Sequence, residues 1–264
     1  MFCKEYRNDI PVSEEVIEKY DLKNVAFFDV ESTGFNKVTD TIVLISLGYI
    51  TGNEFVIKQF FAEDKDDEID ILKAFKGEID PYGIWCSYNG IAFDEPYIMK
   101  KMEIHDMRFI VPERHLDLYR MIKPYQTQLG LERCNLKSVE KLLGIEREDR
   151  IDGALTVQLY KQYVYTNNDG IRDVIMLHNY EDVLYLPELF KLMHELETSS
   201  KYKKPPQITN NQMRYLRKLM NKNNIELNSN INQITKKAAS KAIDAILKGE
   251  SNGEKIDFLI KDTF

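Results

Sequence analysis

Two carboxylates lie two positions apart in the segment FFDVESTGF, which covers residues 27–35. The residues before them, NVAF, are mostly apolar and are typical of a buried β-strand. Since residues i and i+2 of a strand point to the same face, Asp29 and Glu31 converge while Val30 turns to the opposite face. Two unpaired acids on a buried face repel each other and are poorly solvated. They are expected at the end of a strand, in a cleft, with cations between them.

Two more acids follow further along the chain. Asp94 lies in YNGIAFDEPYI, where the chain leaves a predicted strand and begins a helix, at the kind of sheet edge where α/β proteins place their sites. His178 and Asp182 in HNYEDV are four positions apart on a predicted helix and therefore share a face. Each also has a purely structural interpretation: Asp94 as a helix cap, His178 as a half-buried histidine, and Asp182 as a surface acid. The combination of residue types, order and spacing favours a joint site.

Carboxylate ligands without thiolates suit Mg²⁺ or Mn²⁺ rather than zinc. Several carboxylates can hold two such ions roughly 4 Å apart, where the pair clamps a phosphodiester, activates a water and stabilises the leaving oxygen. A histidine beside one ion is placed to position or deprotonate that water. The predicted metal ligands are Asp29, Glu31, Asp94 and Asp182.

The order of the segments FDVESTG, NGIAFDEPYI and HNYEDV resembles the three exonuclease motifs of the DEDD superfamily of 3′–5′ exonucleases, which have a ribonuclease-H-like fold. The segments HLDLYR, CNLKSVEKLLGIERED and DGALTVQLYKQYV resemble, more narrowly, the YprB-type branch of that superfamily. The similarity runs from about residue 24 to residue 195. It implies a metal-dependent 3′–5′ exonuclease that hydrolyses single-stranded nucleic acid with two Mg²⁺ or Mn²⁺ ions.

The resemblance also implies a role for each residue of the site. Asp29 would bridge both ions, whereas Glu31 and Asp182 would hold the ion that carries the nucleophilic water. Asp94 would act on the second ion, directly or through water. His178 would take the place of the general base.

Residues around Thr33, and Asn89 before the second motif, would lie near the terminal nucleotide. The third motif departs from the best-known subclasses, in which three residues separate a tyrosine from the aspartate or four residues separate a histidine from it. Here three residues separate His178 from Asp182. One helical residue is about 100° of rotation, which changes the reach of the imidazole toward the water.

Two other functions compete with this prediction. One is an endonuclease or a hydrolase of the ribonuclease H type that uses the same ions. The other is a nucleic-acid-binding scaffold with weak or absent catalysis, against which the intact set of four acids argues.

Four further polar residues lie near the predicted site. His115 and Asp117 in HLDLYR could line the cleft, but we expect them to have a structural role, since short signals of this kind are rarely ligands. Arg133 and Lys137 are either phosphate contacts or surface charges.

The elements that must position these residues follow from periodicity and turn signals. Strands are predicted at residues 25–32, 41–50, 53–62 and 83–90, with a hairpin at 51–53. Helices are predicted at residues 135–144, 152–164 and about 171–196. Strands followed by helices indicate an α/β fold with a mixed sheet flanked by helices. The resemblance implies that this sheet is ribonuclease-H-like and opens with three antiparallel strands.

The charge of the chain divides it into two predicted parts. Residues 1–200 have a net charge of −14 and form the expected exonuclease domain, whereas residues 201–264 have a net charge of +7. The second part begins with the linker KYKKPPQ and continues with two amphipathic helices, one starting at the capping box TNNQ and one at 235–247. This small helical module holds nucleic acid through its phosphates, or it is a stabilising cap or protein-docking unit.

Composition sets the outer limits of function. The chain has 264 residues, of which 43% are hydrophobic and 30% charged, as in ordinary globular proteins. No apolar run approaches a membrane span, and the start has no signal-peptide pattern, so we expect a cytoplasmic protein without a membrane partner. Three widely separated cysteines, without a CxxC pair, indicate reduced thiols rather than a zinc or redox site.

Overall fold

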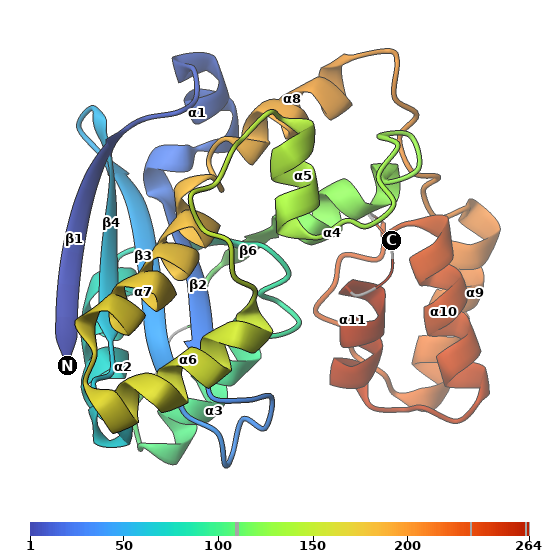
Figure 1. Cartoon of the computed structure of the whole chain (residues 1–264). Coiled ribbons are helices and arrows are strands. Elements are labelled where there is room, and N and C mark those ends of the chain that lie inside the picture. Colours follow the sequence, from blue (N-terminus) through green and yellow to red (C-terminus); the bar gives the residue numbers. More distant parts are fainter. Residues whose placement is uncertain (109–110, 233, 262, 264) are drawn as a thin grey trace. The chain divides into compact units, whose positions relative to one another are not determined.

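The computed structural model describes residues 1–108, 111–232, 234–261 and 263. Contacts divide the chain into two compact units (Figure 1). The first unit comprises Met1–Tyr119 and Asn135–Glu195, and the second comprises Arg120–Cys134 and Leu196–Phe264.

The described residues form one six-stranded mixed sheet in the first unit. Its strands, in spatial order, are β1 (Phe2–Asp9), β4 (Glu54–Phe61), β3 (Ile42–Thr51), β2 (Val25–Ser32), β5 (Ile84–Ser87) and β6 (Arg114–Asp117). The first four pair antiparallel, and β5 and β6 continue the sheet parallel to β2. The prediction of an α/β fold with a mixed sheet is therefore confirmed.

The four predicted strands correspond to β2, β3, β4 and β5, and Gly52 in the hairpin between β3 and β4 has the positive φ of 57° that favours glycine. The strand β1 is absent from the sequence prediction. It lies at an edge of the sheet and exposes most of its side chains, so its sequence, FCKEYRND, lacks an apolar face. The segment HLDLYR divides into the end of β6 and the start of the short helix α4 (Leu118–Ile122).

One face of the sheet is covered by α2 (Glu68–Ile79) and α3 (Asp94–Ile104). Alternation along β2 sends Phe28 and Val30 into this core, where the aromatic ring of Phe28 contacts Phe75 and Trp85. Asp29 and Glu31 therefore turn to the other face, as their spacing predicts.

The opposite face of the sheet is covered by α6 (Gly153–Thr166) and α7 (Asp169–Leu184), which cross in front of the strands in Figure 1. Leu44 and Phe61 of the sheet pack here against Tyr160 of α6 and Met176 of α7. The helix α7 thus lies over the face that carries the two acids of β2.

The predicted single helix at about 171–196 is wrong, because the chain forms two helices there. α7 ends at Leu184, four residues form a turn, and α8 (Leu189–Thr198) begins after them. Pro187 explains the break, since it lacks a backbone N–H and its ring clashes with the carbonyl of a preceding helical turn. The predicted helices at 135–144 and 152–164 are confirmed as α5 (Leu136–Leu142) and α6.

The second unit has a helical core of its own. It contains α9 (Asn210–Asn223), α10 (Lys236–Leu247) and α11 (Gly253–Lys261), whose apolar side chains pack together. The capping box predicted at the start of α9 is present, with the side chain of Thr209 bound to the backbone of Gln212 and the reverse contact also made. The third helix, α11, is a short addition to the two that the sequence predicts.

The remaining described elements are short. They are α1 (Glu14–Tyr20) and the 3₁₀ turns η1 (Leu22–Asn24), η2 (Lys65–Asp67) and η3 (Lys123–Tyr125). No helix among the residues that the structure describes has both the length and the apolar character to cross a membrane.

Candidate active site

The end of β2 is shaped to present two acids on one face. The register with β3 shifts between Glu31 and Ser32, which is a bulge of the kind that re-aims side chains at the end of a strand. The carbonyl of Gly34 accepts hydrogen bonds from the Ser32 hydroxyl at 2.7 Å and from the Tyr97 hydroxyl at 3.2 Å. These contacts fix the point at which the chain leaves the sheet. Asp29 is half-buried and Glu31 is buried.

Asp94 reaches the same region from the first residue of α3. It is buried, with 4% of its surface exposed. Gly90 leaves room for its carboxylate, since a Cβ at that position would lie 3.0 Å from Asp94 Oδ2 and closer still to Ser87. The glycine in the segment NGIAFD is therefore required by the close approach of these side chains.

The pKa values show that the four acids act on one another. Burial raises the pKa of Asp29 well above the ordinary range, and the negative charges of Asp94, Asp182 and Glu31 raise it further. Burial raises the pKa of Glu31 likewise, and Asp182 is the strongest of its charged neighbours. Burial and the nearby charge of Asp117 raise the pKa of Asp94 to about 7. Such mutual repulsion arises because the carboxylates lie close together without enough positive charge between them.

Three of the predicted residues form a compact group of ligand atoms. One atom each from Glu31, His178 and Asp182 lies within 4.8 Å of the others. His178 Nε2 lies 3.5 Å from Glu31 Oε1 and 3.5 Å from Asp182 Oδ2. Because His178 and Asp182 are one helical turn apart on α7, both side chains face the end of β2.

The other ring nitrogen of His178 is bound behind the site. Nδ1 donates a hydrogen bond to Asp149 Oδ2 at 2.8 Å. Although burial alone would raise the pKa of Asp149, hydrogen bonds from Lys137 and His178 hold that pKa below its usual value. Asp149 is therefore ionised and accepts the proton on Nδ1 in a hydrogen bond, which leaves Nε2 facing Glu31 and Asp182.

Arg147 supplies the positive charge behind the third motif. Its Nη1 donates to Asp182 Oδ1 at 2.6 Å, and its Nη2 donates to the backbone carbonyl of His178 at 3.0 Å. It also lies within 3.5 Å of the carboxylates of Glu140, Asp149 and Glu181. Only one oxygen of Asp182 is used by this ion pair, and its Oδ2 stays on the side of His178 Nε2.

Asp29 is oriented by a row of buried polar side chains. Asn179 Nδ2 donates to Asp29 Oδ2 at 2.7 Å, and Ser46 Oγ donates to the carbonyl oxygen of the same amide. Gln59 Nε2 in turn donates to Ser46 Oγ at 2.8 Å and to the backbone carbonyl of Met176 at 2.9 Å. Ser46, Gln59 and Asn179 have no exposed surface. This row fixes which way the Asp29 carboxylate faces.

The two residues expected near the terminal nucleotide lie in the loops that leave β2 and β5. The Thr33 hydroxyl accepts a hydrogen bond from the Thr41 backbone at 2.9 Å, and a second bond joins their backbones, so Thr33 closes the loop from 33 to 41. Asn89 has a positive φ of 68°, and its backbone N–H donates to Asp117 Oδ1 at 2.8 Å. Contacts with a nucleotide stay a prediction for both.

The structural role expected for His115 and Asp117 agrees with their contacts. Asp117 is buried and accepts hydrogen bonds from the backbones of Asn89 and Ile91. His115 Nε2 lies 2.7 Å from Ser87 Oγ, and its Nδ1 pairs with Glu95. Together these contacts hold the loop and first helical turn that carry Asp94.

The two basic residues of the sequence analysis differ from each other. The Nζ of Lys137 donates to Asp149 Oδ2 at 2.7 Å and to the Ile151 carbonyl, so its charge is paired within the protein. It supports His178 from behind. Arg133 is exposed.

Several residues of the site escaped the sequence analysis: Ser46, Gln59, Arg147, Asp149 and Asn179. Arg147 and Asp149 lie in the segment IEREDRID, where six of eight residues are charged and no periodicity separates a buried side chain from a solvated one. A signal existed for Ser46, which is a small polar residue within the apolar run IVLISLGYI of β3.

The donor set fits a divalent cation. Carboxylate oxygens and one imidazole nitrogen are suitable ligands for Mn²⁺, and oxygen alone for Mg²⁺. Burial and then the neighbouring carboxylates raise the pKa values of Asp29, Glu31 and Asp94, and bound cations would favour the charged forms of these acids. The described cysteines, Cys3, Cys86 and Cys134, are free thiols and contribute nothing to this group.

A mixed sheet that presents acids from β2, α3 and α7 at one place defines a protein of the ribonuclease-H-like class. Residues 26–194 match the model of the family described as RNase_H superfamily, and the chain belongs to that superfamily. The expected ribonuclease-H-like fold is therefore confirmed.

One relative has a similar sequence. The chain is 29% identical over 175 residues to the uncharacterized protein YprB of Bacillus subtilis (strain 168), which confirms the resemblance to the YprB-type branch. The match covers 65% of this chain but only 42% of that relative.

Two solved structures show a weaker likeness. The family B DNA polymerase of the archaeon Pyrobaculum calidifontis is 20% identical with a TM-score of 0.48, over 65% of this chain and 25% of the polymerase. Brucella melitensis NrnC with bound Mg²⁺ is 16% identical with a TM-score of 0.32, over 73% of this chain and 94% of NrnC.

Proposed function

We propose that this chain is a metal-dependent nuclease, and more narrowly a DEDD-type 3′–5′ exonuclease that hydrolyses single-stranded nucleic acid. The observation that carries the proposal is the group of mutually repelling carboxylates at the end of β2, with His178 Nε2 placed 3.5 Å from two of them. Membership of the RNase H superfamily supports the reaction class. The cofactor is Mg²⁺ or Mn²⁺, in two copies, held by Asp29, Glu31, Asp94 and Asp182.

When bound, the two ions would polarise the phosphodiester and lower the pKa of the attacking water. The residues of the chain do the rest. His178 accepts the proton of the attacking water at Nε2, because Asp149 holds the other ring nitrogen in its protonated form. Asn179 and Arg147 hold the Asp29 and Asp182 carboxylates in fixed directions, so little reorganisation precedes the reaction.

The spacing of the third motif is compatible with this role. His178 and Asp182 stand a full turn apart on α7, and the imidazole reaches the two carboxylates of Glu31 and Asp182 together. We further propose that Thr33 and Asn89, in the loops that leave β2 and β5, contact the terminal nucleotide.

Digestion of end-labelled linear and circular single strands with Mn²⁺ tests the proposal. We expect stepwise shortening of the linear strand from its 3′ end and no cutting of circles. Cutting of circles indicates an endonuclease, and binding without cutting indicates a scaffold. Asp29→Ala and Asp182→Asn should abolish hydrolysis, whereas Asp173→Asn, an exposed acid of the same helix as Asp182, should not change it.

A further inference from the structure

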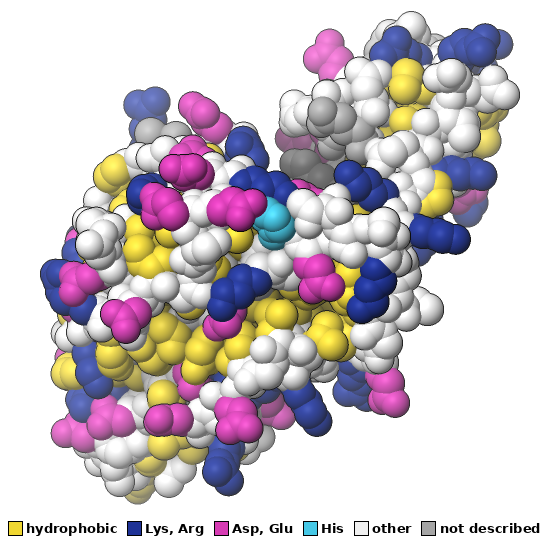
Figure 2. All heavy atoms as spheres, turned by 90° about the horizontal axis from the view of Figure 1, so that it is seen from above, with side chains coloured by type: hydrophobic (Ala, Val, Ile, Leu, Met, Phe, Trp, Pro, Cys, Tyr) yellow, Lys and Arg dark blue, Asp and Glu magenta, His cyan; other side chains and the backbone are white. Residues whose placement is uncertain are grey.

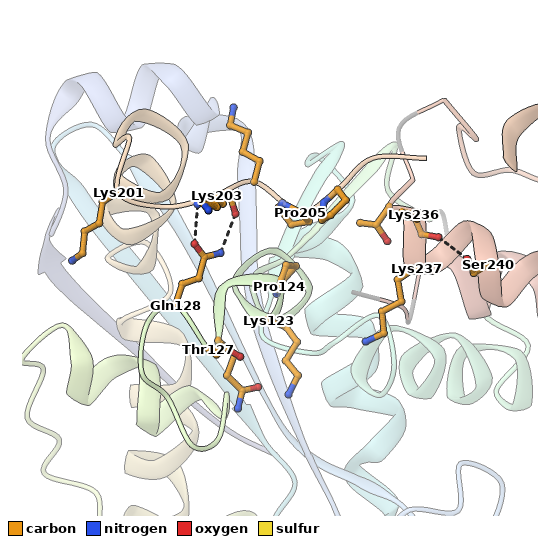
Figure 3. A pocket seen from close by; sticks show the side chains of 14 residues that line it. Lys123, Pro124, Thr127, Gln128, Lys201, Lys203, Pro205, Lys236, Lys237 and Ser240 are labelled. Carbon is orange, nitrogen blue, oxygen red and sulfur yellow. Dashed lines mark hydrogen bonds between the residues drawn. The ribbon is translucent and has the colours of Figure 1, made fainter. Parts of the chain in front are cut away.

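The largest pocket among those described is lined entirely by residues of the second unit. Its volume is about 1100 Å³. It is lined by parts of three segments: the turn that contains η3, the stretch from residue 201 to residue 206, and the start of α10. Figure 3 shows side chains from all three segments around it.

The lining of this pocket is strongly basic. Six of its residues are lysines and none is acidic; they are Lys123, Lys201, Lys203, Lys204, Lys236 and Lys237. The other lining residues are prolines and small or amide side chains. On the face of the chain drawn in Figure 2, by contrast, basic and acidic side chains are interspersed. Six like charges around one pocket favour an anionic occupant.

The charge of the whole second unit points the same way. Residues 120–134 and 196–264 contain 16 lysines and arginines against 8 acidic residues, a net charge of +8. The rest of the chain contains 20 against 35. A substrate with a phosphate backbone is therefore repelled by the first unit in the absence of cations and attracted by the second.

The wall of the pocket is held in place by hydrogen bonds. The side chain of Gln128 accepts from the backbone N–H of Lys203 at 2.8 Å and donates to its carbonyl at 2.9 Å, as the dashed lines in Figure 3 show. At the other end of the stretch, the backbone N–H of Lys236 donates to the Pro206 carbonyl at 2.8 Å. Pro205 and Pro206 restrict the chain between these two ties. The lysines are therefore carried on a fixed backbone.

The types of lining residue also indicate which part of a nucleic acid the pocket binds. Lysine binds phosphate as a point charge, and none of the described lining residues is an aromatic side chain on which a base could stack. The pocket is thus suited to a sugar–phosphate backbone and not to base sequence.

From these observations we infer that the lysine-lined pocket of the second unit binds the phosphate backbone of the nucleic acid strand on which the enzyme acts. The inference rests on the proposed nuclease function for the identity of its ligand. The second unit then binds strands independently of their base sequence, and it binds long strands more tightly than short ones.

The test compares two double variants of the full chain that lose the same charge. Lys236→Gln/Lys237→Gln alters the pocket, and Lys218→Gln/Lys222→Gln removes two exposed lysines of α9 that do not line it. Binding of a labelled 30-nucleotide single strand is measured in EDTA, which prevents hydrolysis, over a range of salt concentrations. Thermal melting checks that both variants are folded.

We expect the pocket variant to bind on the order of tenfold more weakly at 0.1 M salt. The negative slope of log K against log salt should become less steep by about 1.4, since two phosphate contacts are lost. The affinity and slope of the control variant should change little. Equal affinity and slope for both variants would overturn the inference. So would displacement of the strand by poly-L-glutamate at an equal concentration of charges, since the pocket would then accept acidic peptides.

A second measurement separates this inference from the proposed function. Hydrolysis of a trinucleotide with Mn²⁺, which has too few phosphates to occupy the active site and the pocket together, should be equal in wild type and pocket variant. If the wild type hydrolyses nothing, the nuclease proposal fails, and the binding experiment still decides the role of the pocket. If both proteins hydrolyse the trinucleotide and bind the long strand equally, only the pocket inference fails.

Discussion

Asp149 Oδ2 lies 2.8 Å from His178 Nδ1, on the opposite side of the imidazole from the acids of the site. The carboxylate is itself bound by Lys137 and by the backbone of Ile151, so it is a fixed acceptor. The ring of His178 is buried and has one nitrogen left for chemistry.

The first prediction follows from that contact. Asp149→Asn removes the charge that fixes the proton on Nδ1, and we expect kcat for strand hydrolysis to fall about 10- to 100-fold. The matched control is Asp152→Asn, at the N-cap of α6, because the amide oxygen of asparagine can still accept from the backbone N–H of Leu155. Its kcat should stay near that of the wild type. Equal activity of the two variants would show that His178 needs no carboxylate behind it.

The second prediction concerns the repulsion among the acids. Without divalent ions, Asp29→Asn removes a carboxyl group whose charged form is disfavoured by burial and by its acidic neighbours, while an amide oxygen can still accept from Asn179, so the melting temperature should stay equal or rise. With saturating Mn²⁺ the wild type should gain stability, on the order of 2.7 kcal/mol at 100 times Kd, and the variant should gain much less. Differential scanning calorimetry with and without Mn²⁺ measures both. A variant that loses stability without metal contradicts the raised pKa of Asp29.

The third prediction is the pH dependence of stability. The pKa of Asp94 is raised to about 7, and those of Asp29 and Glu31 are also raised, so the folded state binds more protons than the unfolded state. The stability that this gives is fully present below about pH 4 and is lost as pH rises toward and through 7. Metal-free melting temperatures should therefore fall across this window.

The control for that experiment is Asp94→Asn, which removes one titrating group. Its melting temperature should fall less steeply between pH 4 and 7 than that of the wild type. An identical pH dependence in both proteins would mean that Asp94 titrates as an ordinary carboxyl group.

The fourth prediction concerns Arg147, whose side chain is 6% exposed and contacts four carboxylates. Arg147→Ala removes the guanidinium shared by these acids and, in the part of the chain that the structure describes, leaves only Asp149 paired with a lysine, so we expect a loss of about 3–5 kcal/mol in the free energy of unfolding. Arg147→Lys keeps the charge but loses the planar fork, so its loss should be smaller. Urea unfolding measures both. Arg7→Ala, which breaks exposed ion pairs of β1, should have little effect; a similar loss in Arg7→Ala and Arg147→Ala would contradict the account.

Alternation along the strand and the order of the motifs predicted the four residues of the site named next. The i, i+2 spacing of Asp29 and Glu31 fixed their common face, and the i, i+4 spacing of His178 and Asp182 fixed theirs. These are local periodicities, which do not depend on the rest of the chain.

The residues that hold His178 and Asp182 in position could not be predicted in the same way. Arg147 and Asp149 act on His178 and Asp182 across about 30 residues of sequence, and they lie in a loop whose charged residues follow no period. The pairing of Lys137 with Asp149 depends on the same loop and is equally nonlocal. The edge strand β1 was missed for a related reason, because its place in the sheet comes from pairing with β4 and not from an apolar face of its own.

The most direct test of the central claim is to count the cations that this cluster binds. Anomalous diffraction from crystals soaked in Mn²⁺ locates each ion independently of any activity. The account predicts two Mn²⁺ sites, both coordinated by Asp29 and shared among Glu31, Asp94 and Asp182. Crystals with no Mn²⁺ at these four carboxylates, at concentrations that occupy other sites, would contradict it.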